Sequence, residues 1–133
     1  MIKIFVNGTF DVLHRGHIKL LNYAKSLGDY LVVGIDTDDR IKEKKGNLRP
    51  VNNLEERTFI LENLKSVNKV FSFSSDEELE NLIKSIKPDI MVIGSDWKDK
   101  CIIGSYYASK LIFFDRIDGY STTKIIESII DRR

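Results

Sequence analysis

Five short apolar runs, separated by segments with helical periodicity, constrain most strongly what this chain can fold into. Each run is rich in β-branched or aromatic residues and is nearly continuous in its apolar character. Such runs are typical of strands buried on both faces of a parallel sheet. The expected strands span residues 3–6, 30–35, 69–73, 90–93 and 110–114.

Helical periodicity fills the segments between the expected strands. Apolar residues recur every three or four positions, which places one apolar stripe on each helix. The expected helices span residues 18–27, 54–64, 76–86 and about 122–130, and Ser75 with Glu78 fits a capping box at the third. Strands that alternate with helices predict an α/β fold: a doubly wound, Rossmann-like five-stranded parallel sheet with helices on both faces.

Composition limits the class of protein. With 133 residues and a formal net charge of +1, one domain is expected, and no overall field favours nucleic acid or a membrane. No apolar run approaches the roughly 20 residues of a membrane span, and residues 1–6 do not resemble a signal peptide. The single Cys101 forms no internal disulfide and, with two histidines, argues against a structural zinc site. A soluble cytoplasmic protein is expected.

The loop after the first expected strand carries unusual chemistry. His14 and His17 are three residues apart, with Gly16 between them, at the start of a helix. This spacing predicts both imidazoles beside a helix N-terminus, where free N–H groups and the dipole attract an anion such as a nucleotide phosphate. A chance pair, or two ligands of a metal site, is the alternative. Taken alone, Gly8 predicts only a turn and Asp11 a helix cap.

A second anion site is predicted at the last helix. Its N-terminus provides three hydroxyl groups in a row, which is more than capping requires. These residues are Ser121, Thr122 and Thr123, and they follow Arg116. Because ligands of doubly wound sheets bind beyond the carboxyl ends of the strands, this site and the histidine loop are expected to face one cleft.

Two further loops contribute to the same edge of the sheet. After the second expected strand, a lysine run is interpreted as phosphate contacts or as a solvated charged face. Its members are Lys42, Lys44 and Lys45. After the fourth strand come Gly94, Asp96 and Trp97, and Trp97 is expected either to stack on a ligand or to pack.

The string Gly8-Thr9-Phe10-Asp11-x-x-His14-x-Gly16-His17 resembles the signature of the cytidylyltransferase-like nucleotidyltransferases, which are related to the HIGH-motif aminoacyl-tRNA synthetases. The resemblance implies that His14 and His17 contact the triphosphate and stabilise the transition state. It also implies that lysines of the run contact the phosphates of both substrates. A string of the form R-x-x-x-x-S-T-T binds the β- and γ-phosphates in that family.

The resemblance therefore implies three groups of site residues. The expected catalytic residues are His14, His17, Lys44 and Arg116. The expected nucleotide-binding residues are Gly8, Thr9, Phe10, Asp11, Gly16, Lys45, Gly94, Asp96, Ser121, Thr122 and Thr123. The expected substrate-binding residues are Lys42, Arg57 and Trp97. For Arg57, an ion pair or packing of its stem on the core is the alternative.

Two branches of the family compete for the substrates. Residues 44–57 resemble the adenylyltransferase domain of bifunctional heptose-phosphate enzymes, which implies that ATP and D-glycero-D-manno-heptose 1-phosphate give ADP-heptose. Residues 17–21 and 28–33, with Asp96 and Trp97, resemble glycerol-3-phosphate cytidylyltransferase, which makes CDP-glycerol. The first branch is preferred. A non-catalytic nucleotide-binding module on the same fold is a third alternative, which a pyrophosphate-release assay would distinguish.

The expected partners are an NTP and a phosphorylated sugar or polyol, with no nucleic acid and no membrane. Mg²⁺ is expected on the triphosphate, held mostly by its oxygens and by water, so no metal ligands are assigned to the protein. Dimers are common in the family, and a homodimer is expected by that analogy alone. The resemblance covers essentially the whole chain, and residues 1–133 are expected to form a single nucleotidyltransferase domain.

Overall fold

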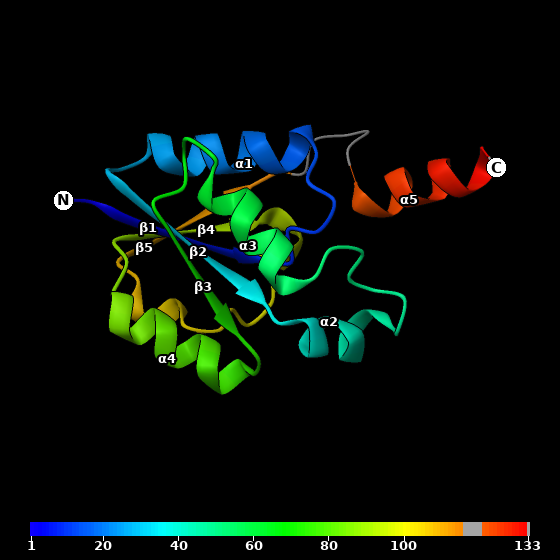
Figure 1. Cartoon of the computed structure of the whole chain (residues 1–133). Helices are drawn as coiled ribbons and strands as arrows, with labels where there is room; N and C mark the ends of the chain where they lie inside the picture. The colour runs from blue at the N-terminus through cyan, green and yellow to red at the C-terminus, as the bar shows by residue number, and fades with distance from the viewer. Residues whose placement is uncertain (116–120, 133) are drawn as a thin grey trace.

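The computed structural model describes residues 1–115 and 121–132, and a five-stranded parallel sheet lies at its centre (Figure 1). The strands are β1 (Lys3–Gly8), β2 (Tyr30–Asp36), β3 (Lys69–Phe73), β4 (Ile90–Gly94) and β5 (Lys110–Phe114). They confirm the expected strands, although β1, β2 and β4 extend one or two residues further. The added residues are polar or glycine, so they pair in the sheet without continuing the apolar pattern.

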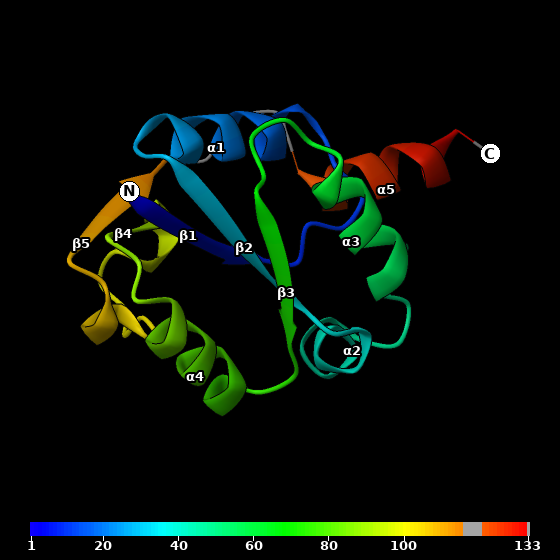
Figure 2. The ribbon, with the colours of Figure 1, turned by 60° about the vertical axis from the view of Figure 1, so that its left-hand side comes forward.

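Helices cover both faces of the sheet, as expected (Figures 1 and 2). The main covering helices are α1 (Arg15–Ser26), α3 (Leu54–Glu62) and α4 (Asp76–Ile86). Leu21 of α1 and Leu61 of α3 pack with Ile4 on one face, whereas Leu79 of α4 packs with Phe5 on the other. Neighbouring strand residues thus point to opposite faces, and both faces are buried. This double burial explains why the strands read as continuous apolar runs.

The structure adds α2 (Asp38–Lys45), which apolar periodicity does not predict because charged residues surround the helix. Its ends are stabilised by charge instead. Asp38 and Asp39 lie in its first turn, and the lysine run lies in its last turn, each beside the complementary pole of the helix dipole. Two short 3-10 helices, η1 (Ser95–Trp97) and η2 (Ser105–Tyr107), follow β4 and were also not expected.

Some helices begin where the sequence predicts, and others do not. α1 begins three residues before the expected position 18, and α5 (Thr122–Asp131) begins where expected. At α4, the Ser75 hydroxyl accepts the N–H of Glu78 at 3.1 Å, as an N-cap should. The other half of the expected capping box is absent, because the Glu78 carboxylate accepts the backbone N–H and the hydroxyl of Ser74.

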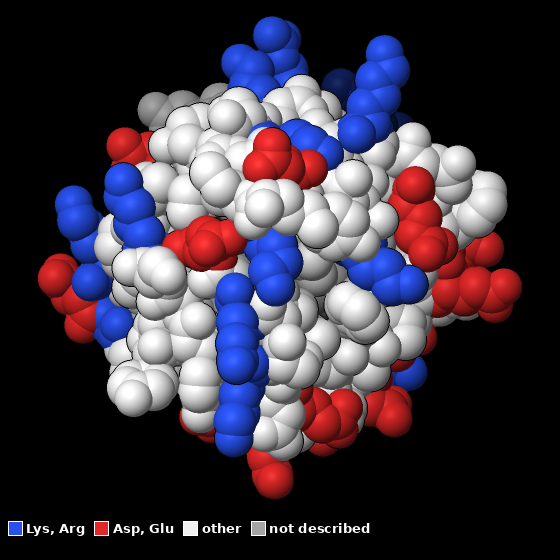
Figure 3. Space-filling model, turned by 90° about the vertical axis from the view of Figure 1, so that its left-hand side faces the viewer, with Lys and Arg blue, Asp and Glu red and all other residues white. Residues whose placement is uncertain are grey.

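The strand order β3-β2-β1-β4-β5 places the reversal of the sheet between β1 and β4. Ligands of doubly wound sheets bind outside the carboxyl ends of the strands at such a reversal. Here those ends are Gly8 and Gly94. The side of the molecule where β1 begins carries Lys and Arg interspersed with Asp and Glu (Figure 3). In the described ranges, no helix has both the length and the apolar character needed to cross a membrane.

Candidate active site

Two histidines form the N-terminal cap of α1. The backbone N–H of Gly16 donates to Nδ1 of His14 at 3.0 Å, and the backbone N–H of His14 donates to Nδ1 of His17 at 3.2 Å. The two ring centroids lie 3.9 Å apart. Because a backbone N–H can only donate, both Nδ1 atoms are unprotonated, and each neutral ring carries its proton on Nε2. The cap therefore fixes the tautomer of both imidazoles.

Burial keeps this pair neutral. It lowers the pKa of His17 to about 4, with further lowering by His14 and Lys45 and an opposing effect of Asp11. Burial also lowers the pKa of His14. At neutral pH both rings are therefore uncharged hydrogen-bond donors. The positive potential that attracts an anion to this place has to come from helix ends and neighbouring cations.

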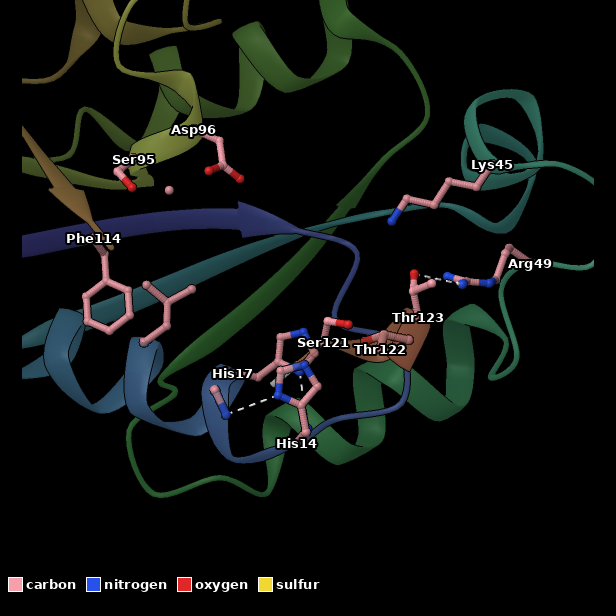
Figure 4. Close-up of a pocket in the computed structure, with 13 residues that line it drawn as sticks. His14, His17, Lys45, Arg49, Ser95, Asp96, Phe114, Ser121, Thr122 and Thr123 are labelled. Atoms are coloured by element: carbon pink, nitrogen blue, oxygen red, sulfur yellow. Dashed lines mark hydrogen bonds between the residues drawn. The ribbon is translucent and has the colours of Figure 1, made fainter. Parts of the chain in front are cut away.

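The N-terminus of α5 lies beside the histidine loop (Figure 4). The Thr122 hydroxyl donates to the carbonyl oxygen of Asp11 at 2.8 Å, and the Ser121 side chain caps the helix. Oγ1 of Thr123 accepts from Nη2 of Arg49 at 3.2 Å. The structure thus brings together the two segments that the sequence assigns to phosphate. Two helix N-termini meet there, and both dipoles favour an anion.

A cavity of about 410 Å³ opens beside these helix ends and the carboxyl end of β4. Its volume lies in the range of small-molecule sites. The predicted site residues in its lining are His14, Gly16, His17, Lys45, Gly94, Asp96, Ser121, Thr122 and Thr123. Leu20 and Phe114 form its apolar wall, and Arg49 and Ser95 complete it. Arg116, the remaining predicted phosphate contact, lies outside the described residues.

A second cavity, of about 350 Å³, shares Lys45 and Gly94 with the first. The other predicted site residues in its lining are Gly8, Thr9, Lys44 and Trp97. Nζ of Lys45 lies 3.5 Å from Oγ1 of Thr9, at the boundary between the two cavities. Lys44 lines only the second of the two cavities, and Lys42 lines neither of them. Lys45 is therefore the lysine placed to contact ligands in both.

Phe10 and Asp11 are buried away from both cavities. Phe10 is 5% exposed and packs in the core. The carboxylate of Asp11, which is 3% exposed, accepts the backbone N–H groups of Val51 at 2.6 Å and Asn52 at 2.9 Å. The structure therefore does not bring these two side chains to a nucleotide site. They hold the loop that carries the histidines.

Arg57 forms an ion pair, which was one of the alternatives that the sequence allowed. The prediction that it contacts the acceptor is corrected, because it lines neither cavity. The residue is 1% exposed, and its Nη2 lies 2.7 Å from Oδ1 of Asp38. Nη1 donates to the carbonyl oxygens of Thr9 at 3.0 Å and Asp36 at 2.8 Å, and Nε donates to that of Asn52 at 2.9 Å. One buried guanidinium thus joins the segments that follow β1 and β2 to the start of α3.

Sequence reasoning missed three charged residues of the two cavities. Arg49 lines the first cavity, and Asp36 and Arg40 line the second. Asp36 directly follows an expected strand and is the last residue of the observed β2, and that position was a usable signal. Arg40 belongs to the helix that periodicity does not reveal. Arg49 reaches its cavity only through the folded loop, and no local pattern marks it.

Comparison with known proteins identifies the family. Residues 5–128 match the model of the family described as Cytidylyltransferase-like. The chain is 49% identical over 126 residues to "Bifunctional protein HldE" of Helicobacter hepaticus, a match that covers 95% of this chain and 26% of the relative. It is 46% identical over 130 residues to the protein of the same name from Campylobacter jejuni subsp. doylei, covering 98% and 28%. The chain thus spans about a quarter of the length of these curated relatives.

Solved structures share the fold. The lipopolysaccharide core biosynthesis protein from Thermoplasma volcanium superposes with a TM-score of 0.68 at 27% identity, over 91% of this chain and 99% of that one. Pantoate-beta-alanine ligase from Francisella tularensis, at 19% identity and a TM-score of 0.60 over 96% and 68%, shows the fold alone. Fold and site together define a nucleotidyltransferase domain. By its sequence match, the chain belongs to the cytidylyltransferase-like family.

Proposed function

We propose that this domain transfers AMP from ATP to a heptose 1-phosphate, forming ADP-heptose and releasing pyrophosphate. The observation that carries the proposal is the meeting of the His14–His17 cap and the start of α5 at one cavity. Such a site offers hydrogen-bond donors along a whole triphosphate. The HldE relatives and the structural neighbour of lipopolysaccharide core biosynthesis support a sugar-phosphate acceptor.

In the proposed reaction, an oxygen of the acceptor phosphate attacks the α-phosphorus in line. The bond between the α-phosphorus and the α,β-bridging oxygen breaks, and pyrophosphate leaves. The acceptor phosphate is already ionised, so no general base is needed, and catalysis consists of positioning and charge stabilisation. His14 and His17 donate from Nε2 to the α-phosphate region, and the N-terminus of α5 holds the β- and γ-phosphates. Lys45 aligns both substrates from the boundary of the cavities.

Mg²⁺ is proposed to arrive with the triphosphate. Within residues 1–115 and 121–132, no group of three or more His, Cys, Asp or Glu side chains is arranged to hold a metal ion. In this proposal, the ion keeps phosphate oxygens and water as most of its ligands. The cytoplasmic location, the homodimer and the single-domain extent of residues 1–133 stay predictions from the sequence.

A substrate matrix tests the proposal. ATP, CTP, GTP and UTP are each combined with heptose 1-phosphate and with glycerol 3-phosphate, and pyrophosphate is measured. We expect release from ATP with heptose 1-phosphate. Release from CTP with glycerol 3-phosphate would replace the proposal by the CDP-glycerol branch. NTP binding without pyrophosphate from any pair would identify a non-catalytic module.

A further inference from the structure

The second cavity holds a charged pair that the proposed chemistry does not use. Asp36 is the last residue of β2, its side chain is 13% exposed, and Arg40 lies one helical turn further along the chain. Both side chains line the cavity. Oδ2 of Asp36 and Nε of Arg40 are 3.8 Å apart, a distance that gives an ion pair but no hydrogen bond.

Arg40 is held firmly in place. Its side chain is 8% exposed, Nη2 lies 2.6 Å from Oδ1 of Asp76, and the guanidinium carbon lies 5.3 Å from the ring centroid of Phe73. Its Nε is nevertheless buried without a hydrogen-bond partner among the described residues. A buried donor without a partner is costly, and the charged acceptor beside it is the Asp36 carboxylate.

Asp36 is a largely buried acceptor with cationic neighbours. Burial raises the pKa of its carboxyl group, and four neighbouring cations oppose this effect: Arg40, Lys44, Lys45 and Arg57. Among the described residues, no hydrogen bond involves this carboxylate; Arg57 donates to the main-chain oxygen of Asp36 instead. The apolar residues in the lining of the same cavity include Phe73, Trp97 and Ile102. Apolar walls with a few fixed polar groups suit a sugar, which presents C–H faces and directional hydroxyl groups.

We propose that Asp36 determines acceptor specificity: its carboxylate accepts hydrogen bonds from hydroxyl groups of the sugar phosphate in the second cavity, and Arg40 positions it. The proposal rests on the proposed function, which supplies the class of acceptor. The sugar lies between Asp36 and the apolar wall, and its phosphate points to Lys44 and to Lys45, which also lines the nucleotide cavity. Hydrogen bonds from hydroxyls to a carboxylate are short and strong, so they discriminate among acceptors.

The test compares Asp36→Ala and Asp36→Asn with the wild type, with Asp39→Asn as the matched control. Asp39 is an exposed aspartate three residues further along the chain, in the first turn of α2, and it lines neither cavity. Calorimetry measures the Kd for heptose 1-phosphate, and pyrophosphate release at varied substrate gives both KM values. We expect Asp36→Ala to raise the Kd and KM for the sugar phosphate about tenfold or more, with the KM for ATP unchanged. The nearly isosteric Asp36→Asn should show a smaller rise, and the control none.

Methyl phosphate, which lacks hydroxyl groups, distinguishes hydroxyl recognition from a structural role. Its Kd should be the same for Asp36→Ala and the wild type. Equal sugar-phosphate Kd values in both proteins, a parallel rise in the KM for ATP, or no sugar-phosphate binding by the wild type would overturn the inference. A wild type that binds the sugar phosphate but releases no pyrophosphate would instead overturn the proposed function, and calorimetry would still decide the role of Asp36.

Discussion

The hydroxyl of Thr122 donates to the carbonyl oxygen of Asp11 at 2.8 Å and joins segments that lie 111 residues apart in the chain. The Asp11 carboxylate in turn accepts from the backbone of residues 51 and 52. One residue of the first loop therefore fixes the start of α5 and the segment before α3. The triphosphate site that we propose depends on this arrangement, because its two anion-attracting helix ends come from opposite ends of the chain.

Thr122→Val should loosen the start of α5. The substitution keeps the shape of the side chain and removes the hydrogen bond to Asp11, which is expected to raise the KM for ATP roughly three- to tenfold. Steady-state kinetics with varied ATP measure the effect. Thr122→Ser keeps the hydroxyl and should restore most of the affinity. Equal KM values for the valine variant and the wild type would show that this bond does not position the phosphate site.

His17→Ala should abolish most turnover. The variant removes one donor to the α-phosphate, and loss of one such donor typically lowers kcat about 10²–10³-fold. Lys19→Ala is the control, since Lys19 is exposed on the same helix and lines neither cavity. Circular dichroism confirms folding of both variants. Turnover of the alanine variant within twofold of the wild type would contradict the role of His17.

Stability should fall in acid through His17. Its pKa is 6.5 in the unfolded reference and about 4 in the folded protein, so between these values the unfolded chain binds more protons. The contribution of neutral His17 to the free energy of unfolding is fully present above pH 6.5 and is lost as the pH falls toward 4. In His17→Gln, the amide oxygen can accept the cap N–H without titrating.

Urea unfolding at pH 7 and pH 5 measures this difference. From pH 7 to pH 5, the wild type should lose about 1 kcal/mol more than His17→Gln, a value reduced for partial solvent screening of the half-buried ring. The raised pKa of Asp36 acts in the opposite direction but equally in both proteins. Identical losses would show that His17 is not held neutral by the fold.

Arg57→Ala should destabilise the fold. It removes a buried guanidinium that makes one ion pair and three hydrogen bonds to main-chain oxygens. Breaking a buried pair costs about 3–5 kcal/mol. Urea unfolding measures the loss, and the exposed Arg15→Ala should change stability by no more than about 0.5 kcal/mol. A stable Arg57→Ala protein with a raised KM for the acceptor would contradict this structural role and would show that Arg57 contributes to acceptor binding.

The sheet could be predicted from the sequence because its strands are buried on both faces. Strands buried in this way have nearly continuous apolar sequences, such as residues 30–35. The place of both histidines beside a helix N-terminus could be predicted from their spacing, whereas their capping bonds through Nδ1 are seen only in the structure. In contrast, α2 has no apolar stripe, and its stability comes from charges at its ends. Periodicity therefore missed the helix that carries Arg40.

Side-chain direction could not be predicted from position alone. Asp11 and Arg57 lie in segments that face the site, yet both turn inward, because backbone N–H and C=O groups of three loops need buried partners there. Asp36 shows the opposite case. It follows the expected strand of residues 30–35 with no motif to mark it, yet it lines the second cavity. Long-range contacts decide these orientations.

A crystal structure of the chain with α,β-methylene ATP tests the central claim most directly. The account predicts the triphosphate between the Nε2 atoms of His14 and His17 and the N-terminus of α5, with donor–acceptor distances of about 2.7–3.2 Å. A triphosphate lying along the lysines of α2, out of contact with both histidines and with Ser121–Thr123, would contradict it.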